Sequence, residues 1–289
     1  MARTDAPLVE RLGYGATDRL IIVNCDDLGS SHSANLASLQ AMERGIATSG
    51  TLMVPCPWAR EAVELFAGRD VGVHLTLTAE YPTYRWRALT GAASLHDDDG
   101  FLPATAEEVR ARADPDEVRA ECRAQVEQAL AWGVDVTHLD AHMGTVQVDP
   151  RFFETYVELA AAFRLPLRMV GAKADAFLGF ESRAKARAAG LVFPDALFAQ
   201  WGRPTGEQMR SEFPKLAPGV AEFLLHPVHD GAELRGYDLT QAEIRVADQG
   251  VSVDPQVAAL IAAERLIPIS YRPLRDLQRA EALADLAPA

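Results

Sequence analysis

The sequence has few cysteines and no long apolar run. Its three thiols, Cys25, Cys56 and Cys122, are odd in number and widely spaced, with no Cys-x-x-Cys pair. Such spacing excludes the disulfide framework that stabilises small secreted domains. No apolar run approaches the roughly 20 residues needed to span a bilayer, and residues 1–18 contain no apolar core of signal-peptide length. We therefore expect reduced thiols and a soluble cytoplasmic protein.

Positive charge is also scarce. The chain has 28 Lys and Arg against 41 Asp and Glu, which gives a formal net charge of -13. Because such a surface repels nucleic acid and anionic membranes, polyanionic partners are excluded and a small neutral substrate fits better. The oligomeric state stays open, a homo-oligomer included.

No linker rich in Gly, Ser or Pro divides the 289 residues, and no internal repeat is present. Alternating strand and helix patterns predict a single α/β domain, a distorted or incomplete (β/α) barrel of the TIM type. We expect residues 1–18 to be a flexible extension and residues 279–289 a frayed tail. A doubly wound open sheet is the alternative, but residues 26–31 lack the Gly-rich phosphate fingerprint of its first turn.

Apolar runs and helical spacing give the expected elements. The first predicted strand lies in the stretch 20–29, and the others are 46–54, 71–77, 136–142, 165–170, 191–193, 221–226 and 266–271. The predicted helices are 33–44, 58–66, 107–132 with a break near residue 115, 150–163, 181–189, 205–213, 256–265 and 274–283. Residues 79–103 lack periodicity, which predicts a long loop that forms a lid or a substrate wall.

The first predicted strand runs into two adjacent carboxylates, Asp26 and Asp27. Neighbouring side chains of a strand point to opposite sides, so the two are not expected to share one role. Carboxylates at the mouth of a core strand are costly unless a cation or hydrogen-bond donors compensate them. The alternative is that both only cap the helix that begins near Ser31.

Polar side chains recur at the ends of later strands. They are His74 in the third strand, His138, Asp140 and His142 in the fourth strand and its exit, and His226 at the end of the seventh. In barrel enzymes this face carries the chemistry. A carboxylate and two imidazoles leave coordination positions open, as a catalytic metal requires. Asp27, His74 and His142 are the expected ligands. His138 is an alternative ligand or a buried support, and Asp140 is expected to orient a ligand imidazole.

At these positions the chain resembles a known family. The matching segments, in order, are Asn24–Gly29, Gly45–Met53, Gly72–Thr78, Thr137–His142, Glu222–Pro227 and Leu266–Tyr271. They resemble the YdjC-like carbohydrate deacetylases, the group that contains chito-oligosaccharide deacetylase. The resemblance implies a distorted barrel, one divalent cation on Asp27, His74 and His142, and hydrolysis of an N-acetyl group on a sugar. It also implies that Asp26 acts as base and His226 as acid.

Two departures and the metal leave questions open. Cys25 stands where a small alanine is usual in the family. Residues 143–147 stand where the family usually continues with further histidines, which would line the same mouth, so the identity of the sugar is not defined. Two imidazoles and a carboxylate favour zinc on ligand softness, whereas the family is commonly described with magnesium; manganese and cobalt are further candidates. Trp86 and Trp201 lie in irregular loops, where they either stack on sugar rings or anchor the loops.

Two other classes of function fit the same barrel. One is a metal-dependent sugar isomerase or lyase that uses Asp26 or His226 to abstract a proton. The other is a sugar-binding barrel without catalysis. For His226, the alternative to catalysis is a hydrogen bond to a neighbouring loop.

Overall fold

A single parallel sheet of seven strands forms the centre of the computed structural model, which describes residues 6–171, 173–199 and 202–284. The strands are β1 (Arg19–Leu28), β2 (Ser49–Leu52), β3 (Val71–Leu75), β4 (Val136–Ala141), β5 (Ala196–Phe198), β6 (Gly219–Leu225) and β7 (Ile267–Pro268). Their order is β4-β3-β2-β1-β6-β5, and β7 pairs with the start of β1. Within the described ranges β4 and β5 do not pair, so the sheet is a curled, incomplete barrel, which confirms the predicted fold class.

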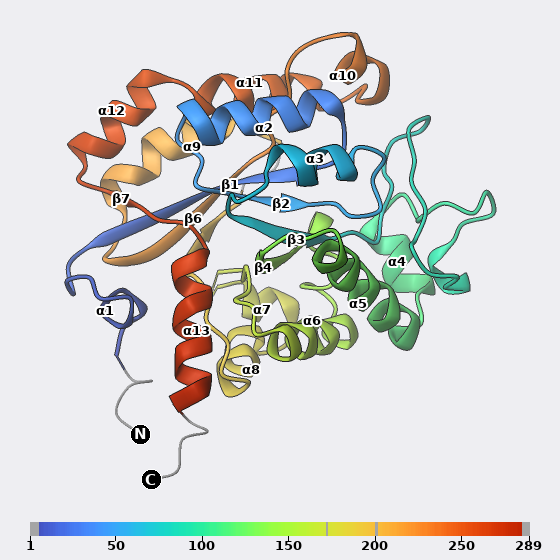
Figure 1. The fold of residues 1–289 in the computed structure, drawn as a ribbon, viewed down its shortest axis with the longest axis horizontal. Coiled ribbons are helices and arrows are strands. Elements are labelled where there is room, and N and C mark those ends of the chain that lie inside the picture. Colours follow the sequence, from blue (N-terminus) through green and yellow to red (C-terminus); the bar gives the residue numbers. More distant parts are fainter. Residues whose placement is uncertain (1–5, 172, 200–201, 285–289) are drawn as a thin grey trace.

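Helices cover both faces of this sheet (Figure 1). They are α1 (Leu8–Arg11), α2 (His32–Arg44), α3 (Ala59–Leu65), α4 (Ala106–Arg112), α5 (Pro115–Ala131), α6 (Pro150–Phe163), α7 (Ala174–Leu178), α8 (Ser182–Ala188), α9 (Thr205–Glu212), α10 (Ala232–Tyr237), α11 (Ala242–Ser252), α12 (Pro255–Ala263) and α13 (Arg272–Ala284). Short 3-10 turns are η1 (Ala93–Leu95), η2 (His142–Gly144) and η3 (Phe213–Lys215). Among the described helices, none is both long and apolar enough to cross a bilayer.

Local sequence signals set several helix starts. The Ser31 hydroxyl accepts the backbone N–H of Ala34 at the start of α2. Asp114 and Asp149 cap α5 and α6 in the same way, and each is followed by a proline at the first helical position. The predicted break near residue 115 is therefore the boundary between α4 and α5.

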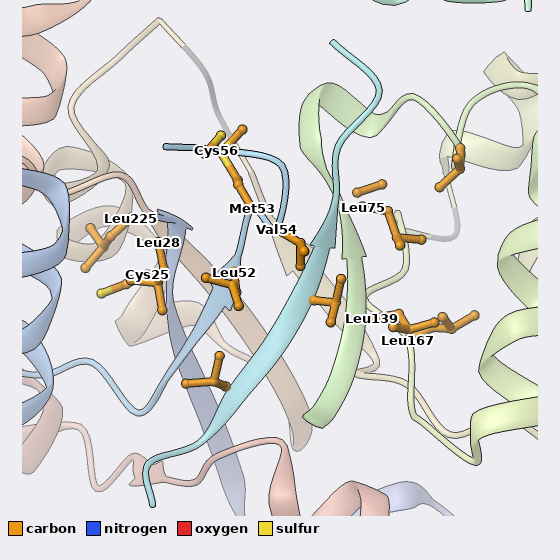
Figure 2. Close-up of a cluster of buried hydrophobic side chains, with 14 of the residues drawn as sticks. Cys25, Leu28, Leu52, Met53, Val54, Cys56, Leu75, Leu139, Leu167 and Leu225 are labelled. Atoms are coloured by element: carbon orange, nitrogen blue, oxygen red, sulfur yellow. The ribbon is translucent and has the colours of Figure 1, made fainter. Parts of the chain in front are cut away.

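The two faces of β1 pack against different clusters. Leu20 and Ile22 belong to a cluster with α1 and α13, whereas Ile21, Val23 and Cys25 belong to the main core. Figure 2 shows Cys25 in that core among side chains from neighbouring strands. All three cysteines are buried free thiols, as expected. Because side chains alternate along a strand, Asp26 falls on the same row as Leu20 and Ile22, at the carboxyl end of β1.

Two predicted strands are wrong in the structure. Residues 165–170 form only an isolated bridge between Leu167 and Leu139, whose side chains lie close together in Figure 2. Pro166 cannot donate a backbone hydrogen bond, which limits ladder formation there. Residues 191–193 are irregular, and the strand of that region is β5, beyond Pro194.

The chain ends are more ordered than expected. Leu8 and Val9 are buried in the cluster with α13, and Arg11 Nη2 lies 2.5 Å from Glu281 Oε2. Residues 6–18 are therefore part of the packed structure rather than a flexible extension, and α13 continues to Ala284. The sequence analysis also missed α10 and α11, which lie between β6 and α12.

Candidate metal centre and active site

Asp26 and Asp27 end β1 at an irregularity in the sheet. Asp27 has a left-handed backbone with φ of 64°, and the pairing of β1 with β2 shifts between Cys25 and Leu28. Such bulges occur beside active sites because they change the direction of a side chain. As a result the two carboxylates have different main partners: Asp26 contacts Arg168, and Asp27 contacts two histidines.

Asp27, His74 and His142 come together as one buried group. Asp27 Oδ1 lies 3.4 Å from His74 Nε2 and 3.3 Å from His142 Nδ1. One ligand atom from each residue lies within 4.8 Å of the other two. Within the part of the chain that the structure describes, the buried Asp27 Oδ1 accepts no hydrogen bond. A carboxylate oxygen left open between two imidazole nitrogens fits a divalent cation.

A polar group stands behind each of these three residues. Asp140 Oδ2 lies 2.6 Å from His74 Nδ1, and Glu80 Oε2 lies 3.1 Å from His142 Nε2. Arg245 Nη1 donates to Asp27 Oδ2 at 2.8 Å. Carboxylates placed this way hold the proton on the far ring nitrogen, so His74 presents Nε2 and His142 presents Nδ1.

The charges in this group shift its pKa values strongly. Burial by itself would raise the pKa of Asp27, but the His142 and His74 imidazoles and Arg245 outweigh it and hold that pKa well below its usual value. Burial opposes the charged form of the histidines, yet Asp140 raises the pKa of His74 to about 9 and Glu80 raises that of His142 to about 10. A bound cation would therefore replace protons on both rings.

Asp26 is held by Arg168. Arg168 Nη1 and Nη2 donate to its two carboxylate oxygens at 2.7 and 2.8 Å. The same guanidinium donates to Asp140, and its Nε donates to Glu222 Oε1 at 2.8 Å. All four side chains are buried. Arg168 thus joins the proposed base to the carboxylate behind His74.

The sequence analysis did not identify Arg168 as a site residue. It falls in the apolar segment 165–170, where the arginine is the single charged residue. A lone charge in a buried run is costly unless it is paired, which was the available signal.

His226 follows β6 and lies beside Asp26. Its Nε2 is 3.8 Å from Asp26 Oδ2, and its Nδ1 is 3.9 Å from Asp248 Oδ2. Asp248, on α11, also accepts the backbone N–H of His226 at 2.9 Å. Burial lowers the pKa of His226, although Asp27 and Asp26 oppose this shift. The structure thus brings together both residues expected to carry protons.

His138 is a buried support and does not join the candidate ligands. Its ring stacks on Tyr271 with centroids 3.7 Å apart, and its Nδ1 lies 3.0 Å from Thr137 Oγ1. A Cβ on Gly72 would meet the imidazole at 2.6 Å, so the glycine makes room for it. Among the described residues, the groups of side chains close enough to hold a metal ion do not include His138.

Of the two tryptophans considered for sugar stacking, the structure describes Trp86, whose ring is buried. Trp86 is 3% exposed, and its indole N–H donates to the Thr78 carbonyl at 2.8 Å. It anchors the loop, which was the alternative to stacking. Trp201 lies outside the described residues.

Glu80, Tyr81 and Arg245 were also missed by the sequence analysis. Tyr81 Oη accepts from Arg245 Nη2 at 2.7 Å, so both residues belong to the surroundings of Asp27. Glu80 and Tyr81 open the long loop, where no periodicity marks a contact. Arg245 and Asp248 are three apart on a helix and both buried, a spacing that places them on one face.

Comparison with known proteins gives a consistent picture. The sequence profile of the YdjC-like protein family matches residues 20–263. The chain is 30% identical to a carbohydrate deacetylase of Geobacillus stearothermophilus over 260 residues, which cover 88% of this chain and 97% of the relative. It is 44% identical to a carbohydrate deacetylase of Thermus thermophilus over 158 residues, which cover 55% of this chain and 56% of that protein.

A solved structure shares the fold. The crystal structure from Enterococcus faecalis V583, described as a candidate cellobiose-phosphate cleavage protein, superposes with a TM-score of 0.77 at 21% identity. The superposition covers 89% of this chain and 99% of the other. Because the family profile matches from β1 to α12, the chain belongs to the YdjC-like family.

Proposed function

We propose that this protein is a metal-dependent hydrolase that removes the N-acetyl group of an amino sugar or short oligosaccharide and releases acetate. The observation that carries the proposal is the open Asp27 Oδ1 between His74 and His142, next to the pair Asp26 and His226. The carbohydrate deacetylases among its relatives support the same reaction.

Asp27, His74 and His142 would hold one divalent cation. When bound, the cation would polarise the acetyl carbonyl and make a water molecule more acidic. The two imidazoles favour zinc, and magnesium, manganese and cobalt are the other candidates.

Asp26 would take the proton of the attacking water. Both of its oxygens are fixed by Arg168, so its orientation is set before the substrate binds. A base held in this way loses no orientational freedom at the moment of reaction. Arg168 also limits the charge that accumulates among the buried carboxylates.

His226 would deliver a proton to the departing amine, since C–N cleavage releases a much better leaving group when the nitrogen is protonated. Asp248 holds the backbone N–H of His226 and faces its Nδ1. On the other side of the ring, Asp26 Oδ2 lies 3.8 Å from His226 Nε2. A small shift of either side chain would let the proton taken by Asp26 pass to His226.

The proposed partner is a small carbohydrate, in keeping with a net charge of -13 that disfavours polyanions. We also propose that the protein acts in the cytoplasm, because its three thiols are free and buried. An assembly of several copies would be compatible with this function.

The test is an acetate-release screen over N-acetylated mono- and oligosaccharides with Mg, Zn, Mn and Co compared. We expect acetate and free amine in equal amounts, and loss of both in Asp27→Asn and His74→Ala. His32→Ala is the matched histidine control, since His32 contacts Glu61 rather than the metal group. An isomerase would instead incorporate solvent deuterium without acetate, and a binding barrel would show no turnover with any metal.

A further inference from the structure

Two consecutive residues of the long loop contact the groups around the metal site. Glu80 Oε2 lies 3.1 Å from His142 Nε2, on the ring edge away from Asp27. Tyr81 Oη accepts a hydrogen bond from Arg245 Nη2 at 2.7 Å. One short segment of the loop therefore reaches two of the three candidate ligands, one directly and one through an arginine.

Arg245 transmits the contact from Tyr81 to Asp27. Its Nη1 donates to Asp27 Oδ2 at 2.8 Å, and its Nε donates to Asp238 Oδ2 at 2.9 Å. With Oδ2 engaged by Arg245, Asp27 turns Oδ1 toward the imidazoles. Arg245 thus selects the oxygen that Asp27 offers, and it favours binding through one oxygen over binding through two.

The side chain of Tyr81 is held in place by its neighbours, which suits it to hold Arg245 against Asp27. Its ring packs edge-on against Tyr237 with centroids 4.8 Å apart, and its side chain is buried. Burial raises the pKa of Tyr81 well above its usual value, although Arg245 opposes the shift, so the hydroxyl stays neutral and accepts from the guanidinium.

The rest of the loop is anchored away from the ligands. Ala79 N–H donates to the Pro103 carbonyl at 2.8 Å, which ties the two ends of the loop together. Further along, the buried Glu121 carboxylate on α5 accepts the backbone N–H groups of Leu89 and Thr90 at 3.0 and 2.8 Å. These bonds seat the loop independently of the metal group.

We propose that the segment Glu80 and Tyr81 is part of the metal centre, with Glu80 positioning His142 directly and Tyr81 positioning Asp27 through Arg245. The inference rests on the metal site of the proposed function. Seating of the loop then raises the affinity for the cation. By linkage, the cation stabilises the seated loop by the same free energy.

The first test is a Co²⁺ titration of the metal-free full chain and its Tyr81→Phe variant, followed by visible absorption. We expect about 10-fold weaker Co²⁺ binding, the lower end of what loss of an outer contact costs. We also expect a changed cobalt spectrum, because Asp27 is no longer restricted to one oxygen. A merely structural role would leave that spectrum unchanged.

The matched control is Tyr84→Phe. It removes a hydroxyl from the same loop, one whose hydrogen bond to the Ser30 carbonyl at 2.6 Å involves neither Arg245 nor the side chain of a candidate ligand. We expect its affinity and spectrum to equal those of the wild type. Glu80→Gln should weaken Co²⁺ binding like Tyr81→Phe, and circular dichroism of the metal-free variants checks that each is folded.

The second test is hydrogen exchange of residues 79–103 with and without Co²⁺. We expect slower exchange with metal in the wild type and a smaller change in Tyr81→Phe. Equal affinities and spectra for Tyr81→Phe and wild type would overturn the inference while acetate release remained intact. The expected cobalt pattern without acetate release would overturn only the deacetylase proposal, and a wild type that binds no Co²⁺ would overturn the metal site and the inference together.

Discussion

Arg168 holds Asp26 through both carboxylate oxygens, at 2.7 and 2.8 Å, although the two residues are far apart in the sequence. The same guanidinium reaches Asp140, which stands behind His74. One guanidinium therefore fixes Asp26, the residue proposed to take a proton, and also fixes Asp140, which orients the proposed metal ligand His74. Changes at Arg168 should affect both catalysis and folding.

Arg168→Lys should separate these two effects. Lysine keeps the charge but loses the planar fork, so Asp26 loses its fixed orientation. We expect kcat to fall at least about 10-fold with little change in KM, because the interaction acts on the reacting geometry. Breaking part of a buried ion pair should also lower the free energy of unfolding, by about 3 kcal/mol. Steady-state kinetics and urea unfolding measure the two, and an unchanged kcat would contradict the role of Arg168.

Glu222 should make stability depend on pH. Burial raises its pKa from 4.5 to about 7, although Arg168 opposes the shift. Between these values the folded chain binds more protons than the unfolded chain. The contribution of Glu222 to the free energy of unfolding therefore falls as pH rises through this window and is constant above it.

Glu222→Gln mimics the protonated carboxyl and should remove this slope. The slope corresponds to on the order of 1 kcal/mol per pH unit for one proton. Urea unfolding of the metal-free wild type and variant at several pH values measures the difference. Parallel curves for the two proteins would show that Glu222 is ionised in the folded state.

His226 and Asp248 should differ in the size of their effects. His226→Gln removes the proposed acid, so kcat should fall by about 100-fold or more. Asp248→Asn still accepts the His226 backbone N–H but no longer offers a charge to its Nδ1, so a smaller loss and a shifted pH profile are expected. Steady-state kinetics over a pH range of about 5 to 9, which brackets the ordinary histidine pKa, compare the two variants. A His226→Gln variant with wild-type kcat would rule out the acid.

His138 and His142 give opposite predictions, although His138 lies in β4 and His142 directly follows it. His142→Gln should abolish binding of one metal equivalent, because a ligand imidazole is lost. His138→Gln should keep one equivalent, since its ring stacks on Tyr271, and should mainly lower the melting temperature. Metal analysis after gel filtration distinguishes them, and metal loss in His138→Gln would restore it as a ligand.

The sequence predicted the strands that carry the site because each is an apolar run ending in a polar residue. Asp27, His74 and His142 could be found this way, since parallel strands bring their carboxyl ends to one edge. Arg168, Arg245 and Glu80 could not be assigned to the site, because the site residues that they contact, Asp26, Asp27 and His142 respectively, lie more than 60 positions away and become neighbours only through folding. The strand at 165–170 failed because Pro166 has no backbone N–H to donate, and the described residues of this segment form an isolated bridge rather than a ladder.

The central claim is that Asp27, His74 and His142 hold one cation needed for hydrolysis. The most direct measurement is acetate release from an N-acetyl sugar by chelated protein as metal is added back. We predict no release after chelation and a rate that rises until one equivalent per chain is bound. Full acetate release by the metal-free protein would contradict the account.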